Sequence, residues 1–168
     1  MRIDPLSSLG QISLEQQAEI YLKELEIHQK NYFQQFCSIL NQPDQDHTAA
    51  EIHLKSLGQD LDFKAARTRE AIQSLYPLNP GFAILLKERY EKRLDELHQD
   101  MSDLSLMAIA QAKEAVHLKH KEIASQMPIN LADAVALQFL IKQCQGLIIL
   151  TREQLQLVHN QRQLSLSP

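Results

Sequence analysis

The stretch that decides the fold spans residues 79–128 and reads NPGFAILLKERYEKRLDELHQDMSDLSLMAIAQAKEAVHLKHKEIASQMP. Asn79 followed by Pro80 marks a helix start, because asparagine caps a helix N-terminus and proline fits its first position. Beyond Gly81 no glycine or proline occurs before Pro128, and apolar residues recur at steps of three and four. The stretch predicts a helix of about 46 residues, or about 69 Å at 1.5 Å per residue.

Proline divides the rest of the chain into three further amphipathic segments. A proline inside a helix costs roughly 3 kcal/mol, and none of the six prolines falls within a helical repeat. The prolines at the joints are Pro43, Pro77, Pro80 and Pro128. We expect helix starts at two capping boxes, Ser13 with Gln16 and Thr48 with Glu51, and at the capping residue Asn130.

These segments predict an all-α fold, an antiparallel bundle of four long helices that forms a single domain over residues 1–168. Tails of about residues 1–12 and 165–168 are expected to be flexible. The first two helices would reach only about 42 Å. The third therefore either extends beyond them or breaks at Asp100–Ser105, where short polar side chains compete for backbone hydrogen bonds. With a further break in the second helix near Gly58, the bundle would have five to six helices.

The fourth segment is the most apolar part of the chain. Between Ala134 and Leu150 it is apolar on nearly every side, which is typical of a helix buried among several others. We therefore expect it to be the central helix of the bundle. Polar residues interrupt it, and it falls short of the ~20 apolar residues that a membrane span needs.

Composition favours a cytoplasmic protein without a cofactor. The net charge is −4 and the apolar fraction is 44%, which is typical of a folded domain rather than a disordered chain. The N-terminal residues lack the apolar core of a signal peptide. Cys37 and Cys144 match no metal-ligand or redox spacing, so we interpret them as small buried hydrophobes. No catalytic motif is present, which disfavours an enzyme and predicts no catalytic residue.

A metal-binding bundle of di-iron or ferritin-like type is an alternative. Glu114 and His117 have the Glu-x-x-His spacing of di-iron carboxylate proteins, and His120 lies three residues further along, a spacing that can share a transition metal. On a helical wheel these side chains point mostly away from the apolar stripe of their helix. A bundle metal site projects its ligands inward, so a solvated helix face explains the three residues better.

A nucleic-acid-binding regulator is the second alternative. It would use five basic residues, Lys64, Arg67, Lys113, Lys119 and Lys121. Proteins that bind nucleic acid usually carry a basic patch or stripe, and the charge totals of this chain indicate none. We therefore expect nucleic acid to be an unlikely class of partner.

The predicted interaction surface lies on the third helix. Leu106, Ile109, Ala110 and Val116 fall outside its core stripe. Either this chain covers both sides of the helix, or these residues meet a partner. We expect a non-enzymatic interaction protein of the coiled-coil kind, such as an adaptor, chaperone or assembly subunit. It would act through helix–helix contacts with a protein partner or as a homodimer.

Overall fold

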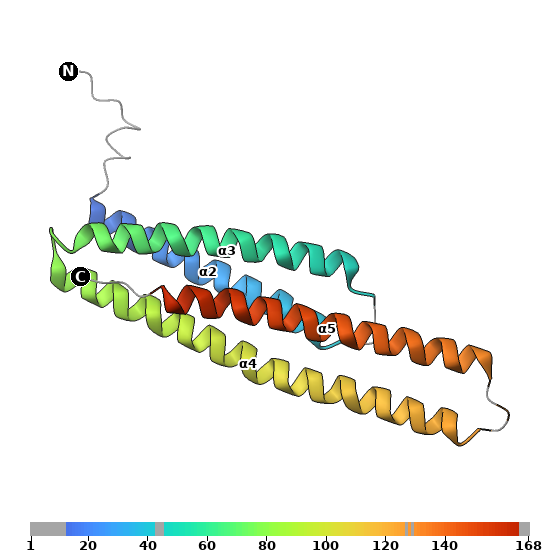
Figure 1. Cartoon of the computed structure of the whole chain (residues 1–168). Helices are drawn as coiled ribbons and strands as arrows, with labels where there is room; N and C mark the ends of the chain where they lie inside the picture. Colours follow the sequence, from blue (N-terminus) through green and yellow to red (C-terminus); the bar gives the residue numbers. More distant parts are fainter. Residues whose placement is uncertain (1–12, 43–45, 127, 129, 165–168) are drawn as a thin grey trace.

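The computed structural model describes residues 13–42, 46–126, 128 and 130–164, and in these ranges it contains four helices and no strand. The helices are α2 (Leu14–Leu40), α3 (Thr48–Leu75), α4 (Pro80–Ala124) and α5 (Leu131–Gln163). Consecutive helices run in opposite directions (Figure 1). The predicted all-α bundle is confirmed. The predicted tails, 1–12 and 165–168, lie outside the described residues.

Three of the four predicted helix starts are confirmed by their capping bonds. Ser13 and Gln16 form the reciprocal capping box at the start of α2. The Asn79 side chain accepts a hydrogen bond from the backbone N–H of Phe82 at 3.2 Å. The Asn130 side chain accepts one from the backbone N–H of Ala132 at 2.9 Å. At each position the side-chain oxygen satisfies an amide that has no partner within the helix.

The capping box predicted at Thr48 is wrong. Thr48 is already the first residue of α3, and the preceding His47 makes no side-chain capping bond. The carboxylate of Asp46 accepts hydrogen bonds from the Thr48 backbone N–H at 3.0 Å and from its hydroxyl at 2.6 Å. Asp46 thus supplies the oxygen that the sequence pattern assigned to Thr48.

The two breaks considered for α3 and α4 do not occur, so the part of the chain that the structure describes has four helices rather than five or six. Gly58 is buried, and it lets α5 approach α3 closely: a Cβ atom there would lie 3.0 Å from Leu157 Cδ2. In α4 the Ser105 hydroxyl donates to the Met101 carbonyl at 2.6 Å. Since that bond lies within the helix, the polar run does not interrupt it.

The bundle is built from two antiparallel pairs, α2 with α3 and α4 with α5 (Figure 1). Across the pairs, α2 and α4 run in the same direction, and Glu26 of α2 accepts hydrogen bonds from Arg89 and Arg93 of α4. α3 and α5 are also parallel, and Lys55 lies 3.6 Å from Glu153. In the centre, the buried hydroxyl of Tyr32 donates to the side-chain oxygen of Gln154.

The pair α4–α5 is longer than the pair α2–α3 and projects beyond it as a hairpin of two helices (Figure 1). The first residues of α3 lie beside Gly146 and Leu147 of α5. On the other pair, Phe33 of α2 lies beside Leu97 and Asp100 of α4. Since α2 ends seven residues after Phe33, the projecting hairpin comprises about residues 107–124 of α4 and 131–146 of α5.

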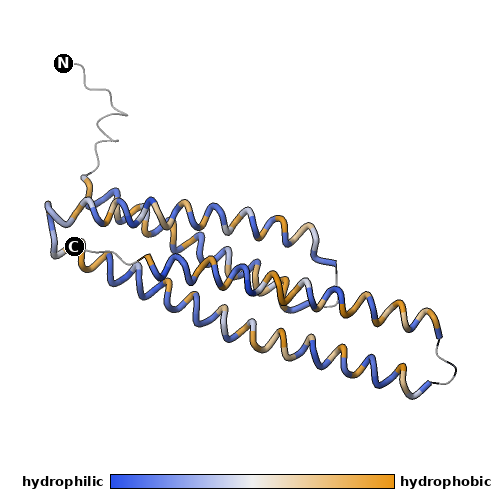
Figure 2. Tube along the Cα trace, in the orientation of Figure 1, coloured by the Kyte–Doolittle hydropathy of each residue, from blue (hydrophilic) through white to orange (hydrophobic). Residues whose placement is uncertain are grey.

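The prediction that the fourth helix is central is wrong. Only 22% of the most apolar 18-residue window of α5 is buried, because among the described helices the outer half of α5 packs against α4 alone. Figure 2 shows apolar residues along this uncovered part of α5. The outer half of α5 is apolar on nearly every side, yet the described residues cover it on the side of α4 alone.

Small residues bring the two hairpin helices together. Ser105, Ala108 and Ala112 of α4 are buried, and the Cys144 thiol donates to the Ala112 carbonyl at 3.6 Å. Such close approach requires small side chains at the contact. Leu118 continues the apolar repeat of α4 in the sequence, yet it is exposed. The contact between α4 and α5 is therefore formed by the small residues of α4, and the larger Leu118 lies outside it.

Candidate functional site

The candidate site is one side of the hairpin. It lies in line with the side of α4 and α5 that packs against α2 and α3, but beyond the ends of those two helices. Phe139 lies eighteen residues before Leu157 on α5, and Leu118 lies eighteen residues after Asp100 on α4. Eighteen residues make about five full turns, so each pair shares one side of its helix. Leu157 faces α3 and Asp100 faces α2. Phe139 and Leu118 therefore face the space that longer α2 and α3 helices would fill.

We call this surface the bare face and define it by four large apolar side chains, Met107 and Leu118 of α4 and Val135 and Phe139 of α5. Their exposed fractions are 61%, 55%, 60% and 57%. Met107 lies eighteen residues, or five turns, after Arg89 and so on the same side of α4. Since Arg89 donates to Glu26 of α2, Met107 faces the same direction as the rest of the bare face. Exposed apolar side chains that gather on one face, rather than scattering singly, indicate a binding surface.

The floor of the bare face is the start of α3. Asp46, Thr48 and Glu51 border a groove of about 300 Å³ whose other wall includes Phe139 and Lys142 of α5. Asp46 carries two hydrogen bonds from Thr48, which lower the pKa of its carboxyl. The bare face thus ends at a polar groove lined by the carboxylates of Asp46 and Glu51 and by the ammonium group of Lys142.

The structure does not bring the four predicted partner residues onto one surface. Val116 is half-buried and packs against the core, and Ile109 is also half-buried. Leu106 and Ala110 are exposed on the side of α4 that faces away from α5. Their binding of a partner stays a prediction. The apolar repeats do not predict the bare face: Leu118 continues the repeat of α4, and the outer half of α5 has the pattern of a buried helix.

The residues of the two alternative hypotheses lie mostly at the surface. Glu114, His117 and His120 are all exposed. Within the described ranges, no group of three or more His, Cys, Asp or Glu side chains is placed to hold a metal ion.

Three of the five basic residues proposed for nucleic acid are paired with carboxylates. Lys64 lies 2.8 Å from Asp60, and Lys119 lies 4.0 Å from Asp133. Arg67 donates to Glu24. Lys64 and Arg67 belong to α3 and the other three to the projecting hairpin, so the five residues are divided between the two parts of the molecule.

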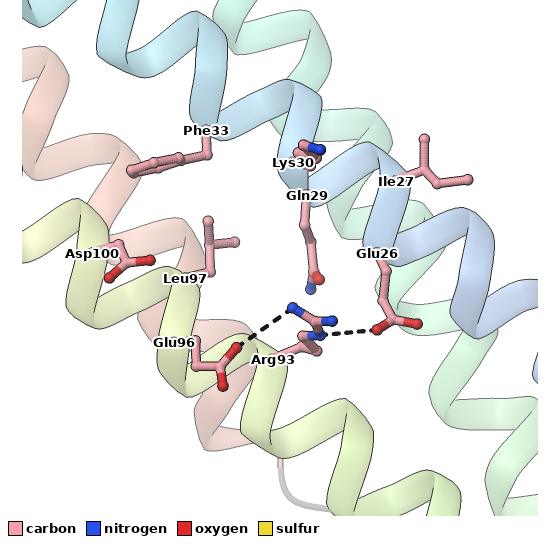
Figure 3. A pocket seen from close by; sticks show the side chains of 9 residues that line it. All are labelled: Glu26, Ile27, Gln29, Lys30, Phe33, Arg93, Glu96, Leu97 and Asp100. Carbon is pink, nitrogen blue, oxygen red and sulfur yellow. Dashed lines mark hydrogen bonds and ion pairs between the residues drawn. The ribbon is translucent and has the colours of Figure 1, made fainter.

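A second groove, of about 470 Å³, lies between α2 and α4 (Figure 3). Arg93 crosses it, bonded to Glu26 at 3.0 Å and lying 3.6 Å from Glu96. Gln29 is buried at its inner side, and its side-chain nitrogen has no hydrogen-bond partner in the structure. Arg93 therefore joins α4 to α2 through Glu26 and pairs with Glu96 within α4.

A separate cluster of polar side chains joins α4 to the end of α5. Arg162 donates to Asp95 at 2.6 Å and to Nδ1 of His98 at 3.1 Å, and the ring of His159 lies 5.8 Å from that of His98. Burial lowers the pKa of His98, and the charges of Arg162 and His159 lower it further, while Asp95 opposes the shift. Nδ1 can accept the bond from Arg162 only while His98 is neutral.

This cluster predicts a loss of stability on mild acidification. Unfolded His98 takes up a proton below its ordinary pKa of about 6.5, whereas the folded protein resists protonation. The free energy of unfolding should therefore fall as the pH drops from about 6.5 through the lowered pKa of folded His98. Urea unfolding at several pH values checks this. His98→Gln should flatten the pH dependence, and the exposed His117→Gln is the control. An unchanged slope in His98→Gln would contradict the assignment.

Comparison of the chain with models of protein families finds no match, and comparisons with curated proteins and with solved structures find none either. One helix of the described part, α5, is long and apolar enough to cross a membrane, with a mean hydropathy of 1.5 over its best window. The same length and composition occur in helices that pack against protein. A functional assignment therefore depends on the surfaces of the molecule itself.

Proposed function

We propose that this protein is a non-enzymatic interaction protein whose binding element is the projecting hairpin. One observation carries the proposal. The side of α4 and α5 that α2 and α3 cover in the four-helix part continues uncovered along the hairpin, with its apolar side chains still in place. A partner that covers this side would extend the bundle with the same kind of helix–helix packing.

The energetics favour an occupant. Fully burying one large apolar side chain contributes about 1.5–3 kcal/mol, so covering the four residues of the bare face would offset a substantial part of the entropy lost on association. Two helices that share a single seam bury little apolar surface by themselves. Stable bundles normally surround such a seam with further helices.

The geometry favours an adaptor or assembly subunit over a chaperone. The bare face lies on two regular helices that continue into the packed four-helix part. Surfaces on such helices are rigid and present side chains at fixed spacing. Proteins that accept many partners tend instead to use flexible loops or methionine-rich surfaces. A defined helical partner therefore suits this face best.

Affinity capture from cells that make the protein tests the proposal. The tagged full chain is compared with Phe139→Glu, which places a charge on the bare face, and with Phe63→Glu. Phe63 is the matched control because it is also a phenylalanine, is 63% exposed, and belongs to α3 in the four-helix part. We expect a protein, this chain included, to be retained by the wild type and the control and lost from Phe139→Glu. If all three retain the same proteins, the proposal fails.

A further inference from the structure

We propose that the groove between α2 and α4 binds a free α-amino acid with a large apolar side chain. This inference goes beyond the proposed function, because it concerns a small ligand on the four-helix part rather than a partner on the hairpin. The groove has a volume of about 470 Å³, which lies within the usual range of small-molecule sites. Three features of its walls point to this class of ligand: a buried amide, an ion pair that a ligand can open, and an apolar end.

The buried amide of Gln29 requires a hydrogen-bond acceptor. Gln29 is only 5% exposed, and none of the described residues accepts a hydrogen bond from its Nε2 atom. Figure 3 shows this nitrogen directed into the groove, toward the guanidinium group of Arg93. A guanidinium group has donors and no acceptor, so Arg93 does not satisfy the amide. A buried donor without an acceptor destabilises a fold. Its presence in the wall of a groove therefore indicates that a ligand supplies the acceptor.

Arg93 has hydrogen-bond donors to spare for the same ligand. Glu26 accepts from Arg89 at both carboxylate oxygens, and it accepts from Arg93 through Nε alone. Nη1 of Arg93 lies 3.6 Å from Glu96, which is longer than a hydrogen bond. The outer edge of this guanidinium group is therefore available to a carboxylate, which arginine binds through two parallel hydrogen bonds. Together with the Gln29 amide, it forms the carboxylate end of the groove.

The carboxylates of α4 select a ligand that also carries an ammonium group. The side chains of Arg93 and Glu96 are 57% and 46% exposed, and an ion pair at the surface is held weakly. A zwitterion can therefore open this pair and leave every charge matched, with its carboxylate on Arg93 and its ammonium group on Glu96. Asp100 lies one turn after Glu96 and borders the same groove, which strengthens the ammonium end. A plain carboxylate or a plain amine would leave one member of the opened pair without a partner.

The remaining wall of the groove is apolar. Phe33 of α2 is half-buried and reaches across the groove toward Leu97 of α4, which is 7% exposed (Figure 3). A side chain the size of leucine or phenylalanine would be removed from water between these two residues, which is favourable in proportion to the apolar area covered. The small side chain of alanine would leave them solvated. The groove therefore favours a large apolar amino acid over a small one.

Isothermal titration calorimetry of the full chain with L-phenylalanine tests the inference. We expect saturable binding of one ligand per chain. Four related probes each lack one feature: 3-phenylpropionate lacks the ammonium group, phenethylamine and L-phenylalaninamide lack the carboxylate, and L-alanine lacks the large side chain. Each should bind at least about tenfold more weakly, because each leaves one end of the groove without its partner. L-phenylalaninamide also represents the N-terminus of a peptide. If it binds as tightly as L-phenylalanine, the groove does not recognise a free amino acid and the inference is wrong.

Two variants with matched controls assign the binding to this groove. Gln29→Leu should weaken binding of L-phenylalanine about tenfold. It should not lower the free energy of unfolding, because it removes a buried donor that has no partner. Tyr76→Phe is its control, since it removes another buried polar atom without a partner, outside the groove, and should leave binding unchanged. Glu96→Gln should also weaken binding about tenfold, whereas Glu114→Gln, on the exposed surface of the hairpin, should not.

Two results overturn the inference. One is the absence of saturable binding with both L-phenylalanine and L-leucine at millimolar concentration. The other is binding that Gln29→Leu and Glu96→Gln leave unchanged, which would place the ligand elsewhere on the molecule. Neither result bears on the hairpin, so the capture experiment with Phe139→Glu decides the proposed function separately.

Discussion

Replacing Tyr32 with alanine is expected to lower the free energy of unfolding by about 3–5 kcal/mol. Tyr32 is fully buried and is among the largest buried side chains of the core. The substitution leaves a cavity between α2 and α5, and it removes the hydroxyl that donates to Gln154. Gln154 is itself buried, so its oxygen would lose its partner without gaining water, which adds to the cost.

Urea unfolding monitored by circular dichroism measures this change, and two tyrosine-to-phenylalanine variants divide it into its parts. Tyr32→Phe keeps the ring and removes the hydrogen bond, so it should cost about 1–3 kcal/mol. Tyr76→Phe is the matched control: the Tyr76 hydroxyl oxygen is buried without a hydrogen-bond partner. Its removal should leave stability unchanged or raise it. Equal costs for the two phenylalanine variants would show that the Tyr32–Gln154 bond contributes nothing.

Replacing Gly58 with leucine should destabilise the fold by about 1–3 kcal/mol or more, because it overpacks a closed contact. A Cβ atom at position 58 would already lie 3.0 Å from Leu157 Cδ2, 3.2 Å from the Gln154 side-chain oxygen and 3.6 Å from Tyr32 Cε2. A leucine side chain extends further into the same space, so α3 and α5 would have to separate there. Thermal and urea unfolding measure the loss.

Two glycines in helix interiors, Gly58 in α3 and Gly146 in α5, provide an internal comparison. Gly58→Ala gains helix propensity worth about 1 kcal/mol and loses part of it to the tight contact with Leu157, so its net effect should be small. Gly146→Ala in α5 meets nothing within 4 Å and should stabilise the protein by about 0.5–1 kcal/mol. If Gly58→Leu is tolerated as well as Gly146→Ala, the close packing of α3 on α5 is refuted.

The parts of the fold that depend on local chemistry could be predicted from the sequence. The caps at Ser13, Asn79 and Asn130 are set by residues within one helical turn, and the helical repeats define the four segments. Asp46 was missed because its carboxylate lies two residues before the helix, where a capping box and an upstream cap look alike. The continuity of α4 was left open because the Ser105 hydroxyl bonds within the helix, which periodicity alone does not show.

The candidate site could not be predicted in the same way, because it depends on which helices end where. An apolar repeat indicates that a side of a helix will be covered, but it does not say by what. The outer half of α5 has the pattern of a buried helix, and α2 and α3 are too short to bury it. On α4, the choice of Ala112 over Leu118 for the seam follows from the close approach of α5 at Cys144, which is a property of the pair.

The unequal lengths of the helix pairs also create a gradient of local stability along single helices. α4 is continuous from Pro80 to Ala124, yet its first half is fixed by three neighbours and its last turns by one. Segments with few packed neighbours open at a lower free energy than the core to which they are joined. An occupant of the bare face would therefore slow the opening of the hairpin without changing the shape of the bundle. Binding would appear as a change in backbone motion, transmitted along a helix that both parts share.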